Sequence, residues 1–575
     1  MVRQAHHDAF WAILSFVQKT CPVTGLAFTV SDAEMALRKK LGIEGEPTLH
    51  PIARWQILGA FWQHWALHKR KCDKTGKQIV SVFSADCPYP VWHKDEWIKH
   101  AAPPSADMDL MKPLFPQMWE LFQRCPIPHN LGTGNENCEY TDDWWYSRNC
   151  YLSHSGVEDE DLRYCFRVLR VKDSQFAVFS FDSQQCLDIT FSHFCSRTIF
   201  ALHSRQCSDS AFLYDCRNCQ HCMFCTNQRN KSYCFANQQL SKEEYEKRSS
   251  AWDFRSRAVY EQAKKEFRNM LQKNAWHRAL LIDLSEDTTG NYLDECRRCT
   301  NCFFTTTNVE DCINCFRGGV NSKDCLDCVN FYEDDLVYCS SSALDKCYDV
   351  RFGYGLIQCK YAEYCAQCFQ CQHCFGCCGL VGKKYHIFNK PYEPEEYEQR
   401  KAEIIVAMKK TGEYGQFFPA HFAANPYEES LAGFHWPLSK AEGEKCGFRM
   451  RATEEEREAN AQDASKVSDR SDQPDKSVLA GQADETTTKT PFWDAEAKRP
   501  FQILKEDIAF AQDLGVPLPY TYYMRRLQEN FRLIPFDGTL RTVACGKCGT
   551  KTQTSWPKEY DGRILCESCY LKEVY

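Results

Sequence analysis

The cysteines of this chain recur in steps of three residues, and this spacing restricts the possible folds more than any other feature. Of 36 cysteines, 27 lie between Cys138 and Cys378. A step of three fits neither the 3.6-residue period of an amphipathic helix nor the two-residue alternation of a hairpin strand. A β-solenoid fits it better, because short strands between corners stack equivalent side chains in inward columns. Eleven cysteines share one phase of this step: Cys138, Cys150, Cys165, Cys186, Cys195, Cys207, Cys216, Cys219, Cys222, Cys225 and Cys234.

Two further regularities refine this prediction. Steps of 21 residues recur, as from Cys165 to Cys186 to Cys207, and predict a solenoid turn of about 21 residues. Asn or Asp often precedes a cysteine, and these residues tolerate the conformations of corners. Cysteine is small and apolar enough to stack in a narrow interior, so packing is the favoured role of most of these thiols. The pairs are Asn149-Cys150, Asp215-Cys216, Asn218-Cys219, Asn301-Cys302, Asp311-Cys312, Asn314-Cys315, Asp324-Cys325 and Asp327-Cys328.

The sequence pattern indicates that the cysteine-rich region is a duplication, with an offset of 152 residues between the two copies. A C-x2-C-x2-C-x2-C run occurs twice, and residues 231–247 also match residues 383–399, sharing EEYE. We therefore expect two solenoid units, residues 138–283 and 292–412. Each should end in a helix, from Ser241 to about 281 and from about 394 to 411, that covers an open end of the solenoid. Metal binding is the weaker alternative to packing for the two runs, which are Cys216, Cys219, Cys222, Cys225 and Cys368, Cys371, Cys374, Cys377.

A second duplication, with an offset of 473 residues, brackets the first. CDKTG (72–76) matches CGKCG (545–549), and HKDEWIK (93–99) matches CESCYLK (566–572), so residues 1–125 and 501–575 are predicted to be copies of one module. KCGFRMR (445–451) faintly mirrors TCPVTGLAF (20–28), which suggests that an insertion interrupts the C-terminal copy. Residues 413–500 would connect the two parts. We expect disorder at about 453–490, which has no aromatic residue and cannot bury enough apolar area to offset chain entropy.

The last thirty residues carry the strongest chemical signal. Cys545-x2-Cys548 and Cys566-x2-Cys569, with 17 residues between the pairs, have the spacing of a tetrahedral zinc site. Gly546 and Gly549 suit the tight turn that aims the first pair of sulfurs at one ion. Four thiolates leave no open position for water, so we predict one structural Zn²⁺ ion and no catalysis there.

The N-terminal copy retains fewer ligands. The offset maps the four cysteines to Cys72, Thr75, His93 and Glu96, and Thr is a poor zinc ligand. A weakened metal site at Cys72, His93 and Glu96 is therefore less favoured than a metal-free fold. Aromatic residues, among them Phe83, Trp92, Trp97 and the segment from Trp55 to Trp65, would hold such a fold together.

Other roles for the thiols are weaker alternatives. The C-x2-C-x2-C opening resembles a bacterial ferredoxin run, but that run continues with x3-C-P, whereas Thr226 and Cys378 follow the fourth cysteine here. The first residues do not have the pattern of an export signal and no stretch reaches the length of a membrane span, so we expect a reducing cytoplasm and no disulfides. A net charge of -7 does not suggest a general nucleic-acid or membrane binder.

Several motifs in combination resemble a family of uncharacterised cysteine-rich bacterial proteins. They are CDKTGKQIVSVFS, PYPVWHKDEW, the two C-x2-C runs, FNKPYEPEEYE and the final CESCYLKEVY. The resemblance implies zinc-ribbon-type end modules around cysteine-rich repeats, with further cysteines in many members at the positions of Thr75, His93 and Glu96. Some members carry a CaiB/BaiF (CoA-transferase) label, which would imply an interlocked α/β dimer with an acyl-carrying Asp. The chain shows no alternating strand–helix pattern that would host such a dimer.

Together these patterns predict a mainly β protein with helical caps. A duplicated cysteine-rich β-solenoid would be flanked by two small α+β modules of the zinc-ribbon or treble-clef type. The favoured function is a non-enzymatic, zinc-binding scaffold that contacts a protein or nucleic acid and not a membrane. The chain has no nucleotide-binding glycine loop, H-E-x-x-H or G-x-S-x-G motif. The alternatives are a thiol-based redox or iron–sulfur protein and an acyl-CoA transferase.

Overall fold

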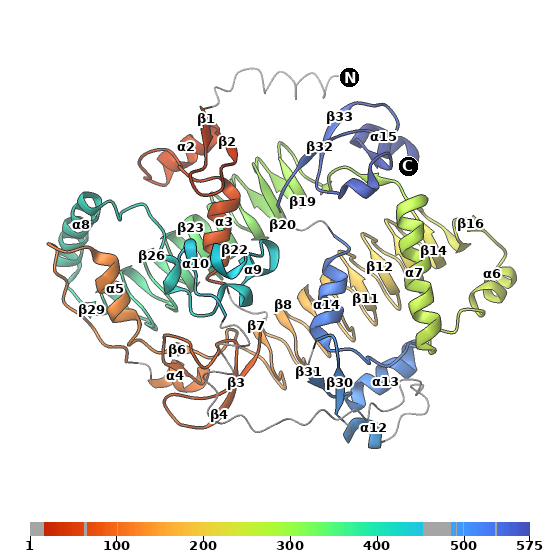
Figure 1. Cartoon of the computed structure of the whole chain (residues 1–575), viewed down its shortest axis with the longest axis horizontal. Coiled ribbons are helices and arrows are strands. Elements are labelled where there is room, and N and C mark those ends of the chain that lie inside the picture. The colour runs from red at the N-terminus through yellow and green to blue at the C-terminus, as the bar shows by residue number, and fades with distance from the viewer. Residues whose placement is uncertain are drawn as a thin grey trace. The chain divides into compact units, whose positions relative to one another are not determined.

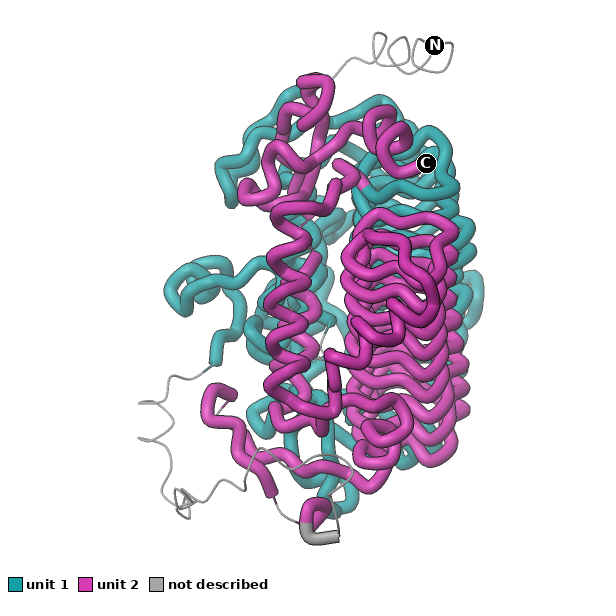
Figure 2. The backbone as a smooth tube through the Cα atoms, turned by 90° about the vertical axis from the view of Figure 1, so that its right-hand side faces the viewer, with its two compact units in different colours: residues 1–130, 281–457 teal, residues 131–280, 458–575 magenta. Residues whose placement is uncertain are grey.

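The chain is mainly β and divides into two compact units. The computed structural model describes residues 17–62, 66–100, 102–451, 485–489, 491–497, 499–534 and 538–575. Strand is more abundant than helix, at 32% against 25%. One unit combines residues 1–130 with 281–457, and the other combines residues 131–280 with 458–575 (Figure 2). Each unit therefore joins one cysteine-rich region to a terminal segment that is distant in sequence.

A ten-stranded sheet forms the cysteine-rich part of the second unit. Its strands are neighbours in the sheet in the order in which they follow along the chain (Figure 1). All pairs are parallel except the last, β15 with β16. The strands are β7 (Asp142–Trp145), β8 (His154–Val157), β9 (Phe166–Leu169), β10 (Val178–Phe181), β11 (Leu187–Thr190), β12 (Ile199–Leu202), β13 (Ala211–Tyr214), β14 (Gln220–Thr226), β15 (Ser232–Phe235) and β16 (Gln238–Gln239).

A left-handed residue at every third position sets the shape of this region. From Asn137 to Ala236, φ is positive at each third residue without a gap. A non-glycine residue in this conformation costs roughly 1 kcal/mol, which Asn and Asp reduce through local hydrogen bonds. All eight Asn and Asp residues singled out before cysteines have positive φ, which confirms their predicted corner conformation. The cysteines of these pairs therefore come directly after corners.

Strand pairing shows that the predicted length of the repeating turn is wrong. Val178 pairs with Phe166 and Thr190, and Ile199 pairs with Leu187 and Ala211, so successive strands are twelve residues apart. Twelve residues are four steps of three. The predicted spacing of 21 residues is seven three-residue steps, whereas the observed repeat is four. Both spacings keep a cysteine at an inward position, but only the observed repeat places it beside its equivalent on the next strand.

Every cysteine from Cys138 to Cys378 is buried except Cys138 and Cys339, which are half-buried. Cys339 and Cys378 pack into the aromatic core of the first unit, outside the sheet interiors. The other cysteines face the interior of the ten-stranded sheet or of a second sheet in the first unit, among aliphatic residues and serines. Buried serines also link neighbouring strands, because Ser204 Oγ accepts the N–H of Cys216 at 3.2 Å and Ser210 Oγ accepts that of Cys222 at 3.0 Å. The prediction of inward thiols in a packed interior is confirmed.

The first unit contains a twelve-stranded sheet of the same kind. Its strand-to-strand step is twelve or thirteen residues over most of its length, as in Leu326 with Tyr338 and Asp335 with Tyr348. The strands are β18 (Ile282–Asp283), β19 (Gly290–Arg297), β20 (Cys302–Glu310), β21 (Phe316–Gly319), β22 (Leu326–Tyr332), β23 (Asp335–Leu344), β24 (Tyr348–Arg351), β25 (Tyr354–Ile357), β26 (Lys360–Glu363), β27 (Gln372–Phe375), β28 (Lys384–Ile387) and β29 (Lys390–Pro391).

Helices follow each sheet, but one prediction about them needs correction. The second predicted helix is confirmed as α8 (Pro394–Thr411), whereas the first divides into α6 (Lys242–Ser249) and α7 (Arg257–Lys273). Ser241 caps α6 by accepting the N–H of Glu244 at 3.2 Å. α7 lies along β13 and β14 and packs Phe267 on Phe200 and Phe212, so it covers a side of the sheet and not an open end (Figure 1).

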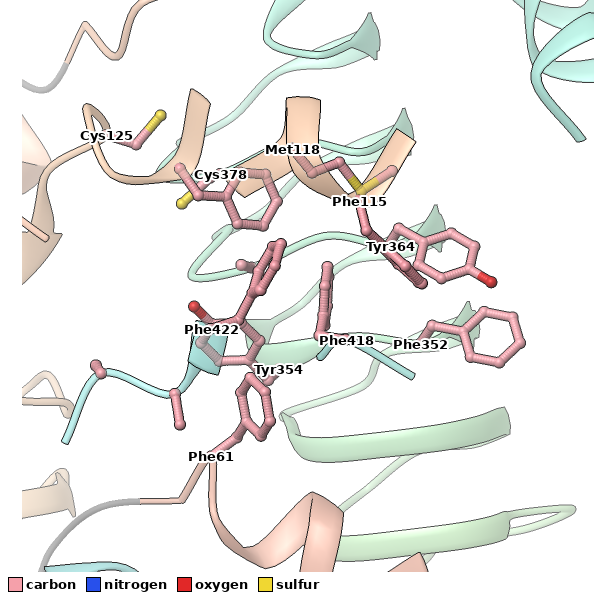
Figure 3. Close-up of a cluster of buried hydrophobic side chains, with 14 of the residues drawn as sticks. Phe61, Phe115, Met118, Cys125, Phe352, Tyr354, Tyr364, Cys378, Phe418 and Phe422 are labelled. Atoms are coloured by element: carbon pink, nitrogen blue, oxygen red, sulfur yellow. The ribbon is translucent and has the colours of Figure 1, made fainter. Parts of the chain in front are cut away.

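The N-terminal segment packs on the second cysteine-rich region through an aromatic core (Figure 3). Phe61 contacts Tyr354 with ring centroids 5.0 Å apart, and Phe115 contacts Tyr364 at 5.8 Å. The elements are β1 (Val17–Thr20), β2 (Ala27–Val30), α2 (Asp32–Lys40), α3 (Pro51–Gly59), β3 (His68–Lys71), β4 (Gln78–Ser81), β5 (Val91–Trp92), α4 (Lys94–His100), α5 (Leu114–Phe122) and β6 (Ile127–Pro128). None of the described helices is both long enough and apolar enough to cross a membrane.

Part of the predicted connector is folded. Residues 413–451 fold into the first unit, whereas the predicted disordered stretch lies outside the described residues except for the helix α12 (Glu485–Lys489). The connector elements are η1 (Ala420–Phe422), η2 (Tyr427–Glu429), α9 (Leu431–His435) and α10 (Lys440–Lys445). The remaining elements are β17 (His277–Arg278), β30 (Phe492–Asp494), β31 (Arg499–Phe501), α13 (Lys505–Leu514), α14 (Tyr523–Phe531), β32 (Arg541–Ala544), β33 (Lys551–Thr554), η4 (Lys558–Tyr560), β34 (Ile564–Leu565) and α15 (Glu567–Val574).

Candidate metal centre

A hairpin and the start of a helix hold the four C-terminal cysteines. Cys545 follows β32, and the turn to β33 closes with the N–H of Gly549 donating to the Cys545 carbonyl at 2.9 Å. Gly549 has φ +74°, which other residues adopt only at a cost. At Gly546 a Cβ atom would lie 2.1 Å from the carbonyl oxygen of Gly562, so only glycine fits. Gly549 thus has the turn-forming role that the sequence predicted, whereas Gly546 is required by the close approach of the Gly562 backbone.

The four sulfurs converge. The Sγ atoms of Cys545, Cys548, Cys566 and Cys569 all lie within 4.8 Å of one another, and those of Cys548 and Cys566 are 3.7 Å apart. Zn–S bonds of about 2.3 Å in a tetrahedron place sulfurs about 3.8 Å apart. The donor set and its spacing therefore fit a metal ion that prefers four thiolates. Among the described residues, this is the one group of three or more Cys, His, Asp or Glu side chains with ligand atoms this close together.

Hydrogen bonds lower the pKa of both cysteines of the first pair, Cys545 and Cys548. The hydroxyl of Thr550 lies 3.3 Å from Cys548 Sγ and, with the backbone N–H of Thr550, lowers the pKa of Cys548 to about 6. Burial opposes ionisation of Cys545, but backbone N–H groups outweigh it and lower the pKa of that thiol. One of them is the N–H of Cys566, 3.3 Å from Cys545 Sγ. Thiolates are the form that binds metal, so these hydrogen bonds favour the binding form of the first pair, whereas the hydrogen bond to Cys548 raises the pKa of Cys569 to about 12.

The centre is tied to the ten-stranded sheet by contacts that sequence analysis missed. Tyr570, one residue after the last cysteine, donates its hydroxyl to Asp215 at 2.5 Å and accepts from Arg229 at 2.8 Å. β34 also pairs in parallel with β17, and Trp556 packs on His277 with ring centroids 4.6 Å apart. These partners lie hundreds of residues apart in the chain, and no local motif indicates such a pairing.

The N-terminal candidate keeps the frame but does not gather its ligands. The N–H of His93 lies 3.3 Å from Cys72 Sγ, as that of Cys566 does from Cys545 Sγ. Thr75 bonds to Cys72, His93 stacks on His129 at 4.6 Å, and Glu96 lies 3.9 Å from His100. Cys72, His93 and Glu96 are absent from the described groups with convergent ligand atoms. Trp97 and Phe83 are buried, as the metal-free alternative expected.

The two four-cysteine runs, which lie wholly within the described residues, also form no convergent group by this measure. Each run occupies four successive inward positions, and its thiols act as hydrogen-bond donors to backbone carbonyls. Cys216 Sγ donates to the carbonyl of Cys225 at 3.4 Å, and Cys368 Sγ donates to that of Cys377 at 3.7 Å. Such donation requires the protonated form. Burial favours that form at Cys216 and Cys368, whose pKa it raises well above the usual value, whereas hydrogen bonds from neighbouring thiols lower the pKa of Cys219 and Cys371.

Comparison with known proteins adds no identification. The sequence matches no protein-family model, and a search of the curated proteins gives no match. The functional assignment therefore rests on the residues and their geometry.

Proposed function

We propose that this protein is a non-enzymatic, zinc-binding scaffold built on two cysteine-rich β-solenoids. The observation that carries the proposal is the convergence of four sulfurs at Cys545, Cys548, Cys566 and Cys569 within 4.8 Å. With four thiolates around it, one Zn²⁺ ion would have no open coordination position, which suits a structural role. The ion would hold the hairpin against α15 and thereby fix Tyr570 at Asp215.

The parallel sheets support the solenoid part of the proposal. Each has a strand-to-strand step of twelve or thirteen residues over most of its length, left-handed residues at or close to every third position, and a thiol-rich interior. A common aromatic stack supports their origin by duplication. His221 stacks on Tyr233 at 5.1 Å, and at the offset of the duplication His373 stacks on Tyr385 at 4.8 Å. Tyr245 and Tyr397, which have the same offset, make edge contacts with Tyr233 and Tyr385.

The charged residues on the outer faces of the two sheets favour a protein partner over a nucleic acid. The cations form ladders with acidic residues on neighbouring strands, as in the contacts of Glu160 with Arg148 and Lys172. Arg170 pairs with Asp182 at 2.8 Å, and Arg298 pairs with Asp311 at 2.6 Å. Cations that are already neutralised release few counterions from a phosphate backbone, which is the main source of affinity for nucleic acids.

Elemental analysis of protein purified without oxygen tests the proposal. We expect about one zinc per chain and no visible absorption band. Replacing Cys545 and Cys548 by Ser should abolish the zinc, whereas Cys446→Ser, at an exposed cysteine outside the centre, should leave it unchanged.

Two outcomes would contradict the proposal. Zinc retained in the double variant would place the ion elsewhere. Iron together with a broad visible band would favour the iron–sulfur alternative over a zinc scaffold.

A further inference from the structure

The hairpin that holds the first metal-site cysteine has three counterparts among the residues that the structure describes. β1–β2, β3–β4, β30–β31 and β32–β33 are each antiparallel pairs. In three of the four the turn closes in the same way, with the N–H of a glycine donating to the carbonyl of a cysteine four residues earlier. These bonds are Gly25 to Cys21 at 2.9 Å, Gly76 to Cys72 at 2.8 Å and Gly549 to Cys545 at 2.9 Å.

In each of these three hairpins, the backbone of the residue that precedes a later helix also bonds to the cysteine. We call this arrangement of a hairpin and a helix start the frame. In the metal centre that residue is Cys566, which precedes α15 and donates its N–H to Cys545 Sγ. His93 before α4 has the same role toward Cys72. The backbone of His50, before α3, bonds to Cys21 and helps to lower its pKa against the effect of burial. The frame of the metal centre thus recurs where four cysteines do not.

The fourth hairpin has an aspartate where the others have cysteine. Asp494 follows Cys21 at the same offset that separates Cys545 from Cys72. Its carboxylate accepts N–H bonds from Ala497 and from Tyr522, the residue before α14, both at 2.9 Å. These donors correspond to those that surround Cys545 in the metal centre. The sequence suggested 445–451 as the partner of 20–28, but Lys445 ends α10 and residues 446–451 form no strand, so that match is wrong.

Arg525 completes the fourth frame. The four ligands of the metal centre form two pairs, and two residues separate the members of each pair. The corresponding residues in the fourth hairpin are Asp494 and Ala497, and those at the start of its helix are Tyr522 and Arg525. The Arg525 guanidinium donates to both carboxylate oxygens of Asp494, at 2.8 and 3.1 Å. The Asp494 side chain is 2% exposed and that of Arg525 is 26% exposed, so a shielded carboxylate and a partly exposed guanidinium join the hairpin to the helix. A cation on the helix side thus holds an anion on the hairpin side, as a bound ion would.

We propose that the Asp494–Arg525 ion pair replaces the metal ion of a former four-cysteine site, so that this hairpin–helix frame is closed without metal. The inference rests on the proposed zinc centre as the parent form of the frame. It implies that chelation opens the frame at Cys545 and leaves the one at Asp494 closed. It also implies that cysteines returned to the four positions would bind zinc.

The test restores the ligands in the full-length chain. In the variant Asp494→Cys, Ala497→Cys, Tyr522→Cys and Arg525→Cys, we expect one zinc per chain more than in the parent protein, retained against a competing chelator. The matched control moves the second pair by one residue, as Asp494→Cys, Ala497→Cys, Thr521→Cys and Met524→Cys. It has the same number and spacing of cysteines, but its second pair is rotated away from the hairpin and should hold no chelator-resistant zinc.

The outcomes separate this inference from the proposed function. A parent protein that holds no zinc would refute the zinc centre at Cys545 and, with it, the inference that takes this centre as the parent form; one zinc in the parent and a second in the fourfold variant would support both. No gain in the fourfold variant, whether or not it folds, would overturn the inference. An equal gain in the control would also overturn it, because the frame would then contribute nothing beyond four nearby thiols.

Discussion

Removal of one interior thiol and one metal-site thiol should separate the two roles assigned to cysteine in this chain. Cys222 is fully buried, and its Sγ donates to the carbonyls of Gln220 at 3.4 Å and Lys231 at 3.6 Å. Cys222→Ala removes a group about the size of a methylene, worth about 0.8 kcal/mol in burial. The small cavity that remains adds about 0.5 kcal/mol. We therefore expect a loss of about 1 to 1.5 kcal/mol in unfolding free energy and no loss of zinc.

Serine offers a matched comparison at the same position. One repeat earlier, Ser210 occupies the equivalent inward position, donates to the Ser208 carbonyl at 2.7 Å and accepts the N–H of Cys222. Cys222→Ser should therefore cost less than Cys222→Ala. At Cys548, which is exposed, both substitutions should abolish zinc binding, because neither side chain supplies a thiolate.

Urea unfolding followed by circular dichroism, with zinc measured on the same samples, provides the assay. The reasoning would be refuted if Cys222→Ala lost zinc, since this thiol would then be a ligand. It would also be refuted if serine were the more damaging substitution, because the hydrogen-bond pattern of the interior would then not extend to this position.

Single contacts give three other predictions. Gly546→Ala should weaken zinc retention against a chelator far more than Gly549→Ala. The new Cβ at residue 546 would lie 2.1 Å from the Gly562 carbonyl oxygen, whereas a Cβ at residue 549 meets nothing within 4 Å. Equal effects of the two substitutions would contradict this. Tyr570→Phe should cost about 1 to 2 kcal/mol and speed hydrogen exchange in α15 with zinc unchanged, and unaltered exchange would show that the Asp215 contact does not hold the helix. Burial raises the pKa of Asp159 well above its usual value, so the folded chain retains a proton that the unfolded chain releases near pH 4. The contribution of Asp159 to stability should then fall as pH rises from about 4. Removing it in Asp159→Asn should therefore shift the slope of the urea midpoint against pH in the positive direction above about pH 4.5, and a shift in the negative direction would contradict this sign.

Local spacing predicted the features that depend on local geometry. The three-residue phase places thiols inward because each corner turns the chain by the same amount, and Asn and Asp mark corners because they tolerate positive φ. The bounds of α8 follow from Pro394 at its first turn and Gly412 in the left-handed conformation after its end. The Cys-x2-Cys pairs predicted the convergent sulfurs for the same reason, since each pair lies on one tight turn or one helix start.

Features that depend on distant contacts were not predictable in this way. The phase of the cysteines is the same for the observed twelve-residue step and for the longer step that the sequence suggested, and only strand pairing distinguishes them. α7 appears amphipathic in the sequence, but the pattern does not say whether its apolar stripe meets the side or the end of a sheet. The ion pair of Asp494 with Arg525 resembles any surface pair in the sequence until the backbone around it is compared with the metal centre.

Reactivity of each thiol in the native protein tests the central claim most directly, namely that the thiols of both sheets pack inward and only the C-terminal four bind metal. Brief alkylation of the native, zinc-loaded chain, followed by mass spectrometry of its peptides, gives the labelled fraction at each cysteine. We predict rapid labelling of the exposed Cys446, labelling of Cys548 only after zinc is removed, and labelling of the buried thiols between Cys150 and Cys378 only on unfolding. Rapid labelling of most of these buried thiols in the native chain, or metal-dependent protection of Cys216, Cys219, Cys222 and Cys225, would contradict the account.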